Sequence, residues 1–329
     1  MRHWPALLAA LVLAACDSTG PRPATLDSRS PPGLSPRFLA PEGWAWGAIQ
    51  APGEPELRYG VSAPAGQGRR AHVLILPDSG EPAEAWFETI TELSSAGYVV
   101  WTLEWEAFGG SGRRVGPHDM AHAESPSAGA RAIAALTTQV IRPETDRPLI
   151  LLGSGDSAAT VVMALQAGAP AAAAILSAPT WGEVRPSGTW EGLALRLRLG
   201  RLPSPEWRPW SREESEQNLE DMNDPWRGRV THGWRLANPD LRQSGLSLGW
   251  RAMQGQARQM ALEAPGRSTR MLILTTPADQ TASVLCQGLW ECERVTEPAT
   301  AAAPHLAADP TRRPWVEQIA AFIAKQTTP

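Results

Sequence analysis

Short apolar runs alternate along the chain with longer stretches in which apolar residues recur at helical spacing. The apolar runs lie at residues 71–76, 98–103, 148–152, 173–176 and 270–275. The stretches of helical spacing lie at 81–97, 128–141, 158–168 and 314–325. Apolar runs of this length are typical of strands that are buried on both faces of a parallel sheet. With an opening hairpin at 44–50 and 57–62, the pattern predicts an α/β fold, with a mostly parallel central sheet and helices on both faces.

Residues 180–265 interrupt this alternation. Short helical patches there are separated by Pro and Gly, which predicts a helical cap inserted between two core strands. The insert holds seven of the fifteen tryptophans, at Trp181, Trp190, Trp207, Trp210, Trp226, Trp234 and Trp250. Two interpretations stay open: the indoles line an apolar substrate pocket, or they pack the cap onto the core.

The first sixteen residues have the pattern of a signal peptide. Arg2 precedes an apolar run at 6–15, which is shorter than the roughly 20 residues that span a bilayer. The run ends in Leu13-Ala14-Ala15-Cys16, which resembles the bacterial lipobox, and the resemblance implies that Cys16 is lipidated after cleavage. The alternative is an ordinary secretory signal with an incidental cysteine. Asp17 resembles an inner-membrane retention signal.

These features predict a protein of the bacterial cell envelope that is lipid-anchored to a membrane and faces the periplasm. Residues 17–43 contain six prolines among Ser, Thr and Gly, and no apolar period. Such a composition predicts a tether, extended or disordered, between the anchor and a folded domain at 44–329. Cys286 and Cys292 then remain as an even pair, which predicts a disulfide; two free buried thiols are the alternative.

The charge and the motifs of the sequence argue against nucleic-acid binding, cofactor binding and metal binding. A formal net charge of −4 without a basic block predicts no nucleic-acid partner. No phosphate-binding loop or dinucleotide fingerprint is present in the sequence, so we expect no cofactor. His118 and His122 are spaced as two metal ligands on one helical face, but no third ligand accompanies them, and we expect no metal site.

The stretch at 149–163 places a Gly/Ser turn between a predicted strand and a predicted helix. That is the context of a nucleophile elbow, G-x-S-x-G, in which a serine lies at the tip of a strained turn. In Gly153-Ser154-Gly155-Asp156-Ser157 the first glycine of the motif is kept. Gly155 stands at the nucleophile position and Ser157 at the final glycine.

Further motifs resemble one family, the α/β hydrolases of the lysophospholipase and monoacylglycerol lipase type, which includes the S33-type serine aminopeptidases. The resemblance runs from about residue 60 to the C-terminus. The first motif is Leu76-Pro77-Asp78-Ser79-Gly80-Glu81, which stands in place of the family's Leu-His-Gly-x-Gly-Glu. The second is Thr102-Leu103-Glu104-Trp105 with Gly109-Gly110-Ser111-Gly112-Arg113, in place of Leu-Asp-x-x-Gly-x-Gly-x-Ser. Two shorter segments also resemble the family: Leu176-Ser177-Ala178-Pro179 before Trp181-Gly182, and Ser247-Leu248-Gly249-Trp250.

The resemblance implies the residues of a catalytic triad. Asp279 stands at the place of the acid and His305 at the place of the base. Pro77 and Asp78 replace the His-Gly pair of the family's oxyanion loop; a proline has no N–H, and a carboxylate opposes a developing oxyanion.

The nucleophile itself stays open between two readings. Gly155 has no oxygen with which to attack an acyl carbon. Ser157 is the candidate substitute, because Gly155-Asp156-Ser157-Ala158-Ala159 resembles the Gly-Asp-Ser-Ala-Gly elbow of hormone-sensitive-lipase-like esterases. Ser157 also suits a helix N-cap. Ser154 is a weaker candidate, because its side chain is expected to point away from the pocket.

Two functions are compatible with these residues. The resemblance implies hydrolysis of carboxylic esters, such as lysophospholipids or monoacylglycerols, at the membrane. The alternative is a non-catalytic pseudo-hydrolase that binds an acyl ligand or a protein partner in the cell envelope.

Overall fold

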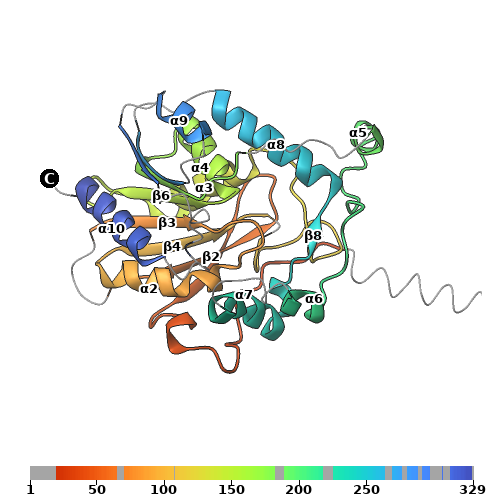
Figure 1. Cartoon of the computed structure of the whole chain (residues 1–329), viewed down its shortest axis with the longest axis horizontal. Helices are drawn as coiled ribbons and strands as arrows, with labels where there is room; N and C mark the ends of the chain where they lie inside the picture. The colour runs from red at the N-terminus through yellow and green to blue at the C-terminus, as the bar shows by residue number, and fades with distance from the viewer. Residues whose placement is uncertain are drawn as a thin grey trace, which may run out of the picture.

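The central element of the fold is an eight-stranded sheet (Figure 1). The computed structural model describes residues 20–64, 70–106, 108–181, 189–217, 225–263, 269–275, 280–287, 291–296, 306 and 312–327. The strands are β1 (Ala45–Gln50), β2 (Glu56–Ser62), β3 (His72–Leu76), β4 (Val99–Glu104), β6 (Leu149–Ser154), β7 (Ala171–Ser177), β9 (Arg270–Thr275) and β10 (Cys292–Thr296). Their order is β1-β2-β4-β3-β6-β7-β9-β10.

The sheet is mostly parallel, as the alternation of strands and helices predicted. β1 pairs antiparallel with β2, and β2 pairs antiparallel with β4. The remaining neighbours are parallel. The opening hairpin and the five predicted core strands are confirmed to within three residues at either end.

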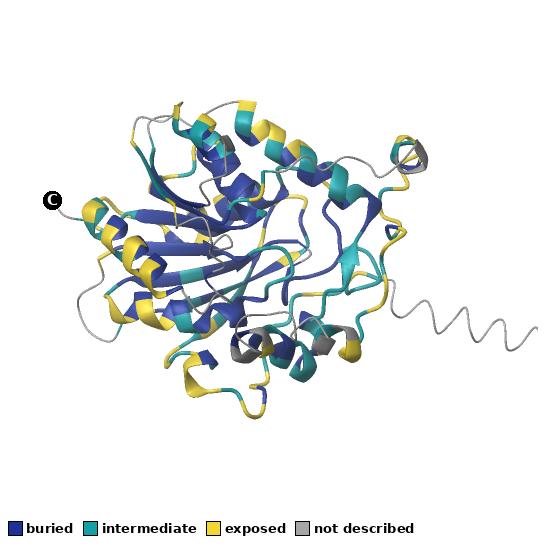
Figure 2. Cartoon of the chain, in the orientation of Figure 1, coloured by how far each residue is buried: buried dark blue, intermediate teal, exposed yellow. Residues whose placement is uncertain are grey.

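Helices cover both faces of the sheet. The core helices are α2 (Phe87–Ser95), α3 (Ala128–Leu136), α4 (Ser157–Gln166), α9 (Gln280–Gln287) and α10 (Arg313–Thr327). Successive residues of β6 enter different apolar clusters: Leu149 and Leu151 pack with α3 and α4, whereas Ile150 and Leu152 pack with α2 and α10. A strand buried on both sides needs apolar residues at every position, and this explains the uninterrupted apolar run. Figure 2 shows the buried sheet between partly exposed helices.

The elements of the predicted cap lie between β7 and β9. They are α5 (Thr189–Arg196), α6 (Arg212–Gln217), α7 (Pro225–Ala237), η4 (Pro239–Leu241), β8 (Gly245–Leu246) and α8 (Leu248–Glu263). Trp250 of α8 stacks on Trp105 of the core, with ring centroids 5.5 Å apart. Trp234 of α7 meets the edge of Phe87 of α2, also at 5.5 Å. For these two tryptophans the packing interpretation holds.

Residues 20–43 lie along the domain and contact the cap. The Arg22 guanidinium pairs with Asp240 at 2.6 Å between Nη1 and Oδ1. Asn238 forms two hydrogen bonds with the backbone of Arg29: its Oδ1 accepts the N–H at 2.7 Å, and its Nδ2 donates to the carbonyl at 2.9 Å. This part of the predicted tether is therefore extended but attached, and we call it the strap.

The strap also contacts the core. Arg22 and Arg113 form an antiparallel bridge, with N···O distances of 2.7 and 2.8 Å. The Ser28 hydroxyl donates to Glu84, and Phe38 is buried among core residues. Composition alone could not show these contacts, because proline-rich polar segments gain their order here from partners far away in the sequence.

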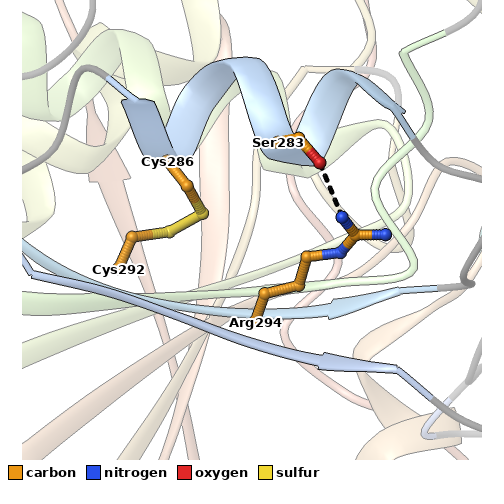
Figure 3. The surroundings of a disulfide bond; sticks show 4 residues. All are labelled: Ser283, Cys286, Cys292 and Arg294. Atoms are coloured by element: carbon orange, nitrogen blue, oxygen red, sulfur yellow. Dashed lines mark hydrogen bonds between the residues drawn. A yellow bond between two sulfur atoms is a disulfide. The ribbon is translucent and has the colours of Figure 1, made fainter.

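Two elements near the C-terminal edge are absent from the sequence prediction. β10 joins the sheet as an edge strand, and its residues are only partly buried, so it carries no apolar run. Helix α9 precedes it. Cys286 of α9 is bonded to Cys292 of β10, with the α-carbons 5.3 Å apart (Figure 3). The predicted disulfide is confirmed, and Arg294 adds a hydrogen bond to Ser283 at 2.6 Å.

Within the described part of the chain, no helix combines the length and the apolar character needed to cross a bilayer.

Candidate functional site

The predicted elbow is present between β6 and α4. Gly155 lies at its tip with φ of +52°, a left-handed conformation that favours glycine. A β-carbon on Gly153 would lie 2.8 Å from the carbonyl oxygen of Ser157, so the helix packs against the end of the strand too closely for a side chain there. The Gly155 N–H donates to the Ser177 carbonyl of β7 at 2.9 Å, and this bond holds the turn above the sheet.

The carboxylate of Asp78 occupies the space beside the elbow tip. A β-carbon built on Gly155 would lie 2.1 Å from Asp78 Cγ and 2.2 Å from each of its Oδ atoms. Parallel pairing of β3 with β6, in which Leu76 lies opposite Gly153, brings the two strand ends together. A side chain at position 155 and the observed Asp78 side chain therefore exclude each other.

Two backbone N–H groups hold one oxygen of that carboxylate. Asp78 Oδ1 accepts the N–H of Ser79 at 2.7 Å and the N–H of Asp156 at 2.8 Å. Oδ2 has no hydrogen-bond partner among the residues that the structure describes. Burial, and then the nearby charges of Glu81 and Asp156, raise the pKa of Asp78 to about 7, although the two N–H bonds oppose the rise.

Arginines of the cap brace the loops around the elbow. Arg258 of α8 donates to Asp156 Oδ1 at 2.6 Å, and Thr180 donates to the same oxygen at 2.7 Å. Arg235 of α7 donates to the carbonyl of Gly80, and burial lowers its pKa to about 10. Neither arginine stands out in the sequence, because nothing in the spacing of the cap residues links them to loops that lie far away along the chain.

Ser157 lies beneath the elbow. It is the first residue of α4 and is fully buried, and its hydroxyl donates to the carbonyl oxygen of Pro77 at 2.6 Å. The N-cap of α4 is Asp156, which makes no side-chain cap bond, so the predicted N-cap role of Ser157 is wrong. Ser154 is also fully buried, at the end of β6, and its Oγ has no partner in the described part of the chain. Pro77 thus contributes a carbonyl to Ser157, whereas Asp78 contributes its carboxylate to the elbow.

The other predicted site residues lie outside the described residues. These are Cys16, Asp17, Asp279 and His305. The structure therefore brings together Gly155, Pro77, Asp78 and Ser157, and the roles of the acid and the base stay predictions.

The two histidines that share a helical spacing bind separate partners. His118 Nε2 lies 2.7 Å from the Gly20 carbonyl. His122 is buried and its Nδ1 lies 2.9 Å from Ser247 Oγ, and burial lowers the pKa of His122. Among the residues with described positions, no group of three or more His, Cys, Asp or Glu side chains is placed to hold a metal ion.

Solved structures are similar to this chain over most of its length. A thermostable carboxyl esterase from Bacillus coagulans, in complex with glycerol, superposes with a TM-score of 0.64 over 88% of this chain and 100% of its own, at 13% identity. The fold is that of the α/β hydrolases. A soluble variant of the monoglyceride lipase from Saccharomyces cerevisiae, in complex with a substrate analogue, gives 0.63 over 94% of this chain and 99% of its own, at 14% identity.

A monoacylglycerol lipase from Paleococcus ferrophilus gives a TM-score of 0.59 over 82% of this chain and 99% of its own, at 14% identity. No protein-family model and no curated protein matches the sequence. At these identities the similarity establishes the fold.

The Asp78 contacts can be compared with the backbone N–H groups that lie beside the elbow in the α/β-hydrolase fold. In this fold the oxyanion hole combines the N–H of the residue after the elbow nucleophile with an N–H from the loop that follows a neighbouring strand. In this chain Asp156 directly follows Gly155, and Ser79 lies in the loop after β3. Both N–H groups are taken by Asp78 Oδ1. The protein's own carboxylate therefore occupies the two N–H groups beside the elbow tip.

Proposed function

We propose that this protein is a non-catalytic α/β-hydrolase-fold lipoprotein of the bacterial cell envelope, and that it binds an acyl ligand without cleaving it. One observation carries the proposal: the Asp78 carboxylate lies against Gly155 and accepts the N–H of Asp156 in the elbow and the N–H of Ser79 in the loop after β3. A serine mechanism needs a hydroxyl at the tip and free donors beside it. At this elbow the hydroxyl is missing, and the donors are occupied by Asp78.

The fold supports the class of ligand. Similar solved structures include a carboxyl esterase, a monoacylglycerol lipase and a monoglyceride lipase, the last with a substrate analogue bound. A relative that has lost its nucleophile would keep a site shaped for an acyl chain and a polar head. The lipobox that ends at Cys16 supports a membrane location, where such ligands are abundant.

The competing function is hydrolysis of carboxylic esters through Ser157. It is favoured by the order of elbow, Asp279 and His305 along the chain. It requires Ser157 to break its bond to the Pro77 carbonyl and to turn out of a fully buried position. The Asp78 carboxylate would also have to leave the two N–H groups, and the loss of a single oxyanion donor typically costs ~10²–10³ in rate.

A fluorophosphonate probe separates the two functions. We expect the purified full chain to form no adduct and to leave a short p-nitrophenyl ester intact. A covalent adduct that persists in Ser154→Ala and disappears in Ser157→Ala would refute the proposal and establish the esterase.

Ligand binding is tested separately. We expect monoacylglycerol below its critical micelle concentration to raise the melting temperature of the full chain and to change its tryptophan fluorescence. If monoacylglycerol, lysophospholipid and free fatty acid all leave both signals unchanged, the acyl ligand is excluded, and a protein partner becomes the object of the search.

A further inference from the structure

Large apolar side chains are exposed on one segment of the cap. Seven large apolar residues are exposed in the described part of the chain, and four of them lie within ten positions. These are Leu193, Leu197, Leu199 and Leu202, which are 47%, 59%, 37% and 48% exposed. They begin in α5 and continue into the turn after it. We call residues 193–202 the leucine segment.

Arginines alternate with these leucines. Arg196, Arg198 and Arg201 are exposed, and the leucine segment contains no acidic residue. Arg201 pairs with Glu124. Neither Arg196 nor Arg198 has an ion pair with any described residue. The segment therefore combines apolar side chains with two cations that no carboxylate of the described chain neutralises.

The backbone of the segment is held in place by the rest of the cap. Gly249 N–H donates to the Gly200 carbonyl at 2.8 Å, and Leu248 N–H donates to the Leu202 carbonyl at 2.9 Å. Ala194 of α5 is fully buried. The exposed leucines thus project from a fixed backbone, and the protein presents them to the outside instead of packing them inward.

The leucine segment lies near the point where the strap begins. Ser204 N–H donates to Leu246 of β8, and β8 pairs with β5 (Met120–Ala121). His118, two residues before β5, contacts the carbonyl of Gly20. Cys16 is only four residues before Gly20, which is roughly 14 Å at full extension. Figures 1 and 2 show α5 projecting at the end of the molecule opposite α10.

We infer that the leucine segment docks on the surface of a bilayer that contains anionic phospholipid. Leucines at the boundary between headgroups and acyl chains, with arginines directed to the phosphates, are the pattern of an interfacial membrane contact. Gly20, four residues after the proposed anchor at Cys16, lies on the same side of the molecule. The inference thus rests in part on the membrane location under the proposed function. The leucine segment would then be a second contact beside the lipid anchor, and two contacts would fix the orientation of the cap on the membrane.

The test places a fluorescent probe on the segment. Leu197→Cys and, as the matched control, the exposed Met260→Cys on α8 are labelled with an environment-sensitive nitrobenzoxadiazole dye in the full lipidated chain. Cys286 and Cys292 are in the disulfide and do not compete for the label. On vesicles of phosphatidylcholine and phosphatidylglycerol, doxyl-labelled lipid should quench the probe at 197 several-fold more strongly than the probe at 260.

Charge neutralisation gives a second measurement. Arg196→Gln with Arg198→Gln should lower the insertion equilibrium of the probe at 197 by roughly fivefold per arginine on the anionic vesicles. Arg142→Gln, at an exposed arginine elsewhere, should leave it unchanged.

A nickel-chelating lipid that captures an N-terminal histidine tag in place of residues 1–16 makes the test independent of Cys16. If the lipidated chain fails to float with vesicles but the tagged chain still inserts position 197, the anchor is wrong and the docking surface stands. Equal quenching at 197 and 260 in the tagged chain would overturn the docking surface. A blue shift in the emission of the probe at 197 without vesicles would also overturn the membrane docking surface, because it would show that a second copy of the chain covers the segment.

Discussion

The carboxylate of Asp78 lies directly over Gly155, within 2.2 Å of the place that a β-carbon would take. Position 155 is glycine for two reasons at once: its φ of +52° and the presence of this carboxylate. The two residues lie just after the neighbouring strands β3 and β6, and the carboxylate of one fills the space left by the missing side chain of the other. An elbow that had merely lost its serine would leave an open space there, whereas this one is filled and hydrogen-bonded.

This relationship predicts strong coupling between the two positions. Gly155→Ser in the presence of Asp78 should lower the free energy of unfolding by about 2–4 kcal/mol, because the new side chain overlaps the carboxylate. In an Asp78→Ala background the same substitution should cost only about 1 kcal/mol, the strain of the left-handed backbone. A double-mutant cycle by urea denaturation measures the difference. Additive effects of the two substitutions would contradict the contact.

The raised pKa of Asp78 predicts a pH dependence of stability. The folded protein binds the proton of Asp78 up to a pH of about 7, whereas the unfolded chain releases it near pH 4. The stabilisation from this proton is complete below pH 4 and is lost as the pH rises to about 7.

Asp78→Asn keeps an oxygen for both N–H groups and removes the charge. It should therefore stabilise the protein by about 1–3 kcal/mol at pH 8 and change little at pH 4. Asp27→Asn, at an exposed position, is the matched control. Urea denaturation at both pH values measures the effect, and an equal effect at the two values would show that the carboxylate is not the cause.

A buried charge cluster predicts the largest single loss of stability. Arg58 is fully buried and donates two hydrogen bonds to Glu104, at 2.6 and 2.9 Å, and two to Glu84, both at 3.0 Å. Arg58→Met would leave two buried carboxylates without their cation and should cost about 3–5 kcal/mol. Arg147→Met removes the surface partner of Glu144 and should cost far less, because the pair is screened by solvent. Chemical denaturation compares the two.

The contacts of the strap predict where proteases cut. Asn238→Ala removes both hydrogen bonds to the backbone of Arg29. Trypsin should then cleave after Arg29 several-fold faster than in the parent chain, because the local opening costs less. Gln259→Ala, which removes an exposed hydrogen bond on α8, serves as the control. Mass spectrometry of the early fragments reads the site, and unchanged cleavage at Arg29 would mean that these bonds do not hold the strap.

The disulfide predicts a local effect at the edge of the sheet. Cys286→Ser with Cys292→Ser opens a short loop, and the chain-entropy estimate for such a loop is about 2 kcal/mol. Because the bond ties α9 to the edge strand β10, amide exchange should rise first in β10. Hydrogen-exchange mass spectrometry measures it, and a uniform rise across the sheet would argue for global destabilisation instead.

Much of the fold is encoded in local patterns. The apolar runs of the core strands and the helical spacing after them were sufficient to predict a parallel sheet covered on both faces. The predicted elbow between β6 and α4 is present with its strained glycine. These features follow from short uninterrupted apolar runs, from a periodicity of 3.6 residues and from the special conformations of glycine, which short stretches of sequence carry by themselves.

The filled elbow and the attached strap were decided by the tertiary structure. Asp78 and Asp156 are separated by 78 positions, and Arg22 and Asp240 by 218. Pairing of β3 with β6 brings the first pair together, and packing of the cap brings the second. The sequence determined which residue types stand at the elbow. Whether the Asp78 carboxylate reaches the elbow depends on contacts between distant segments that no local pattern records.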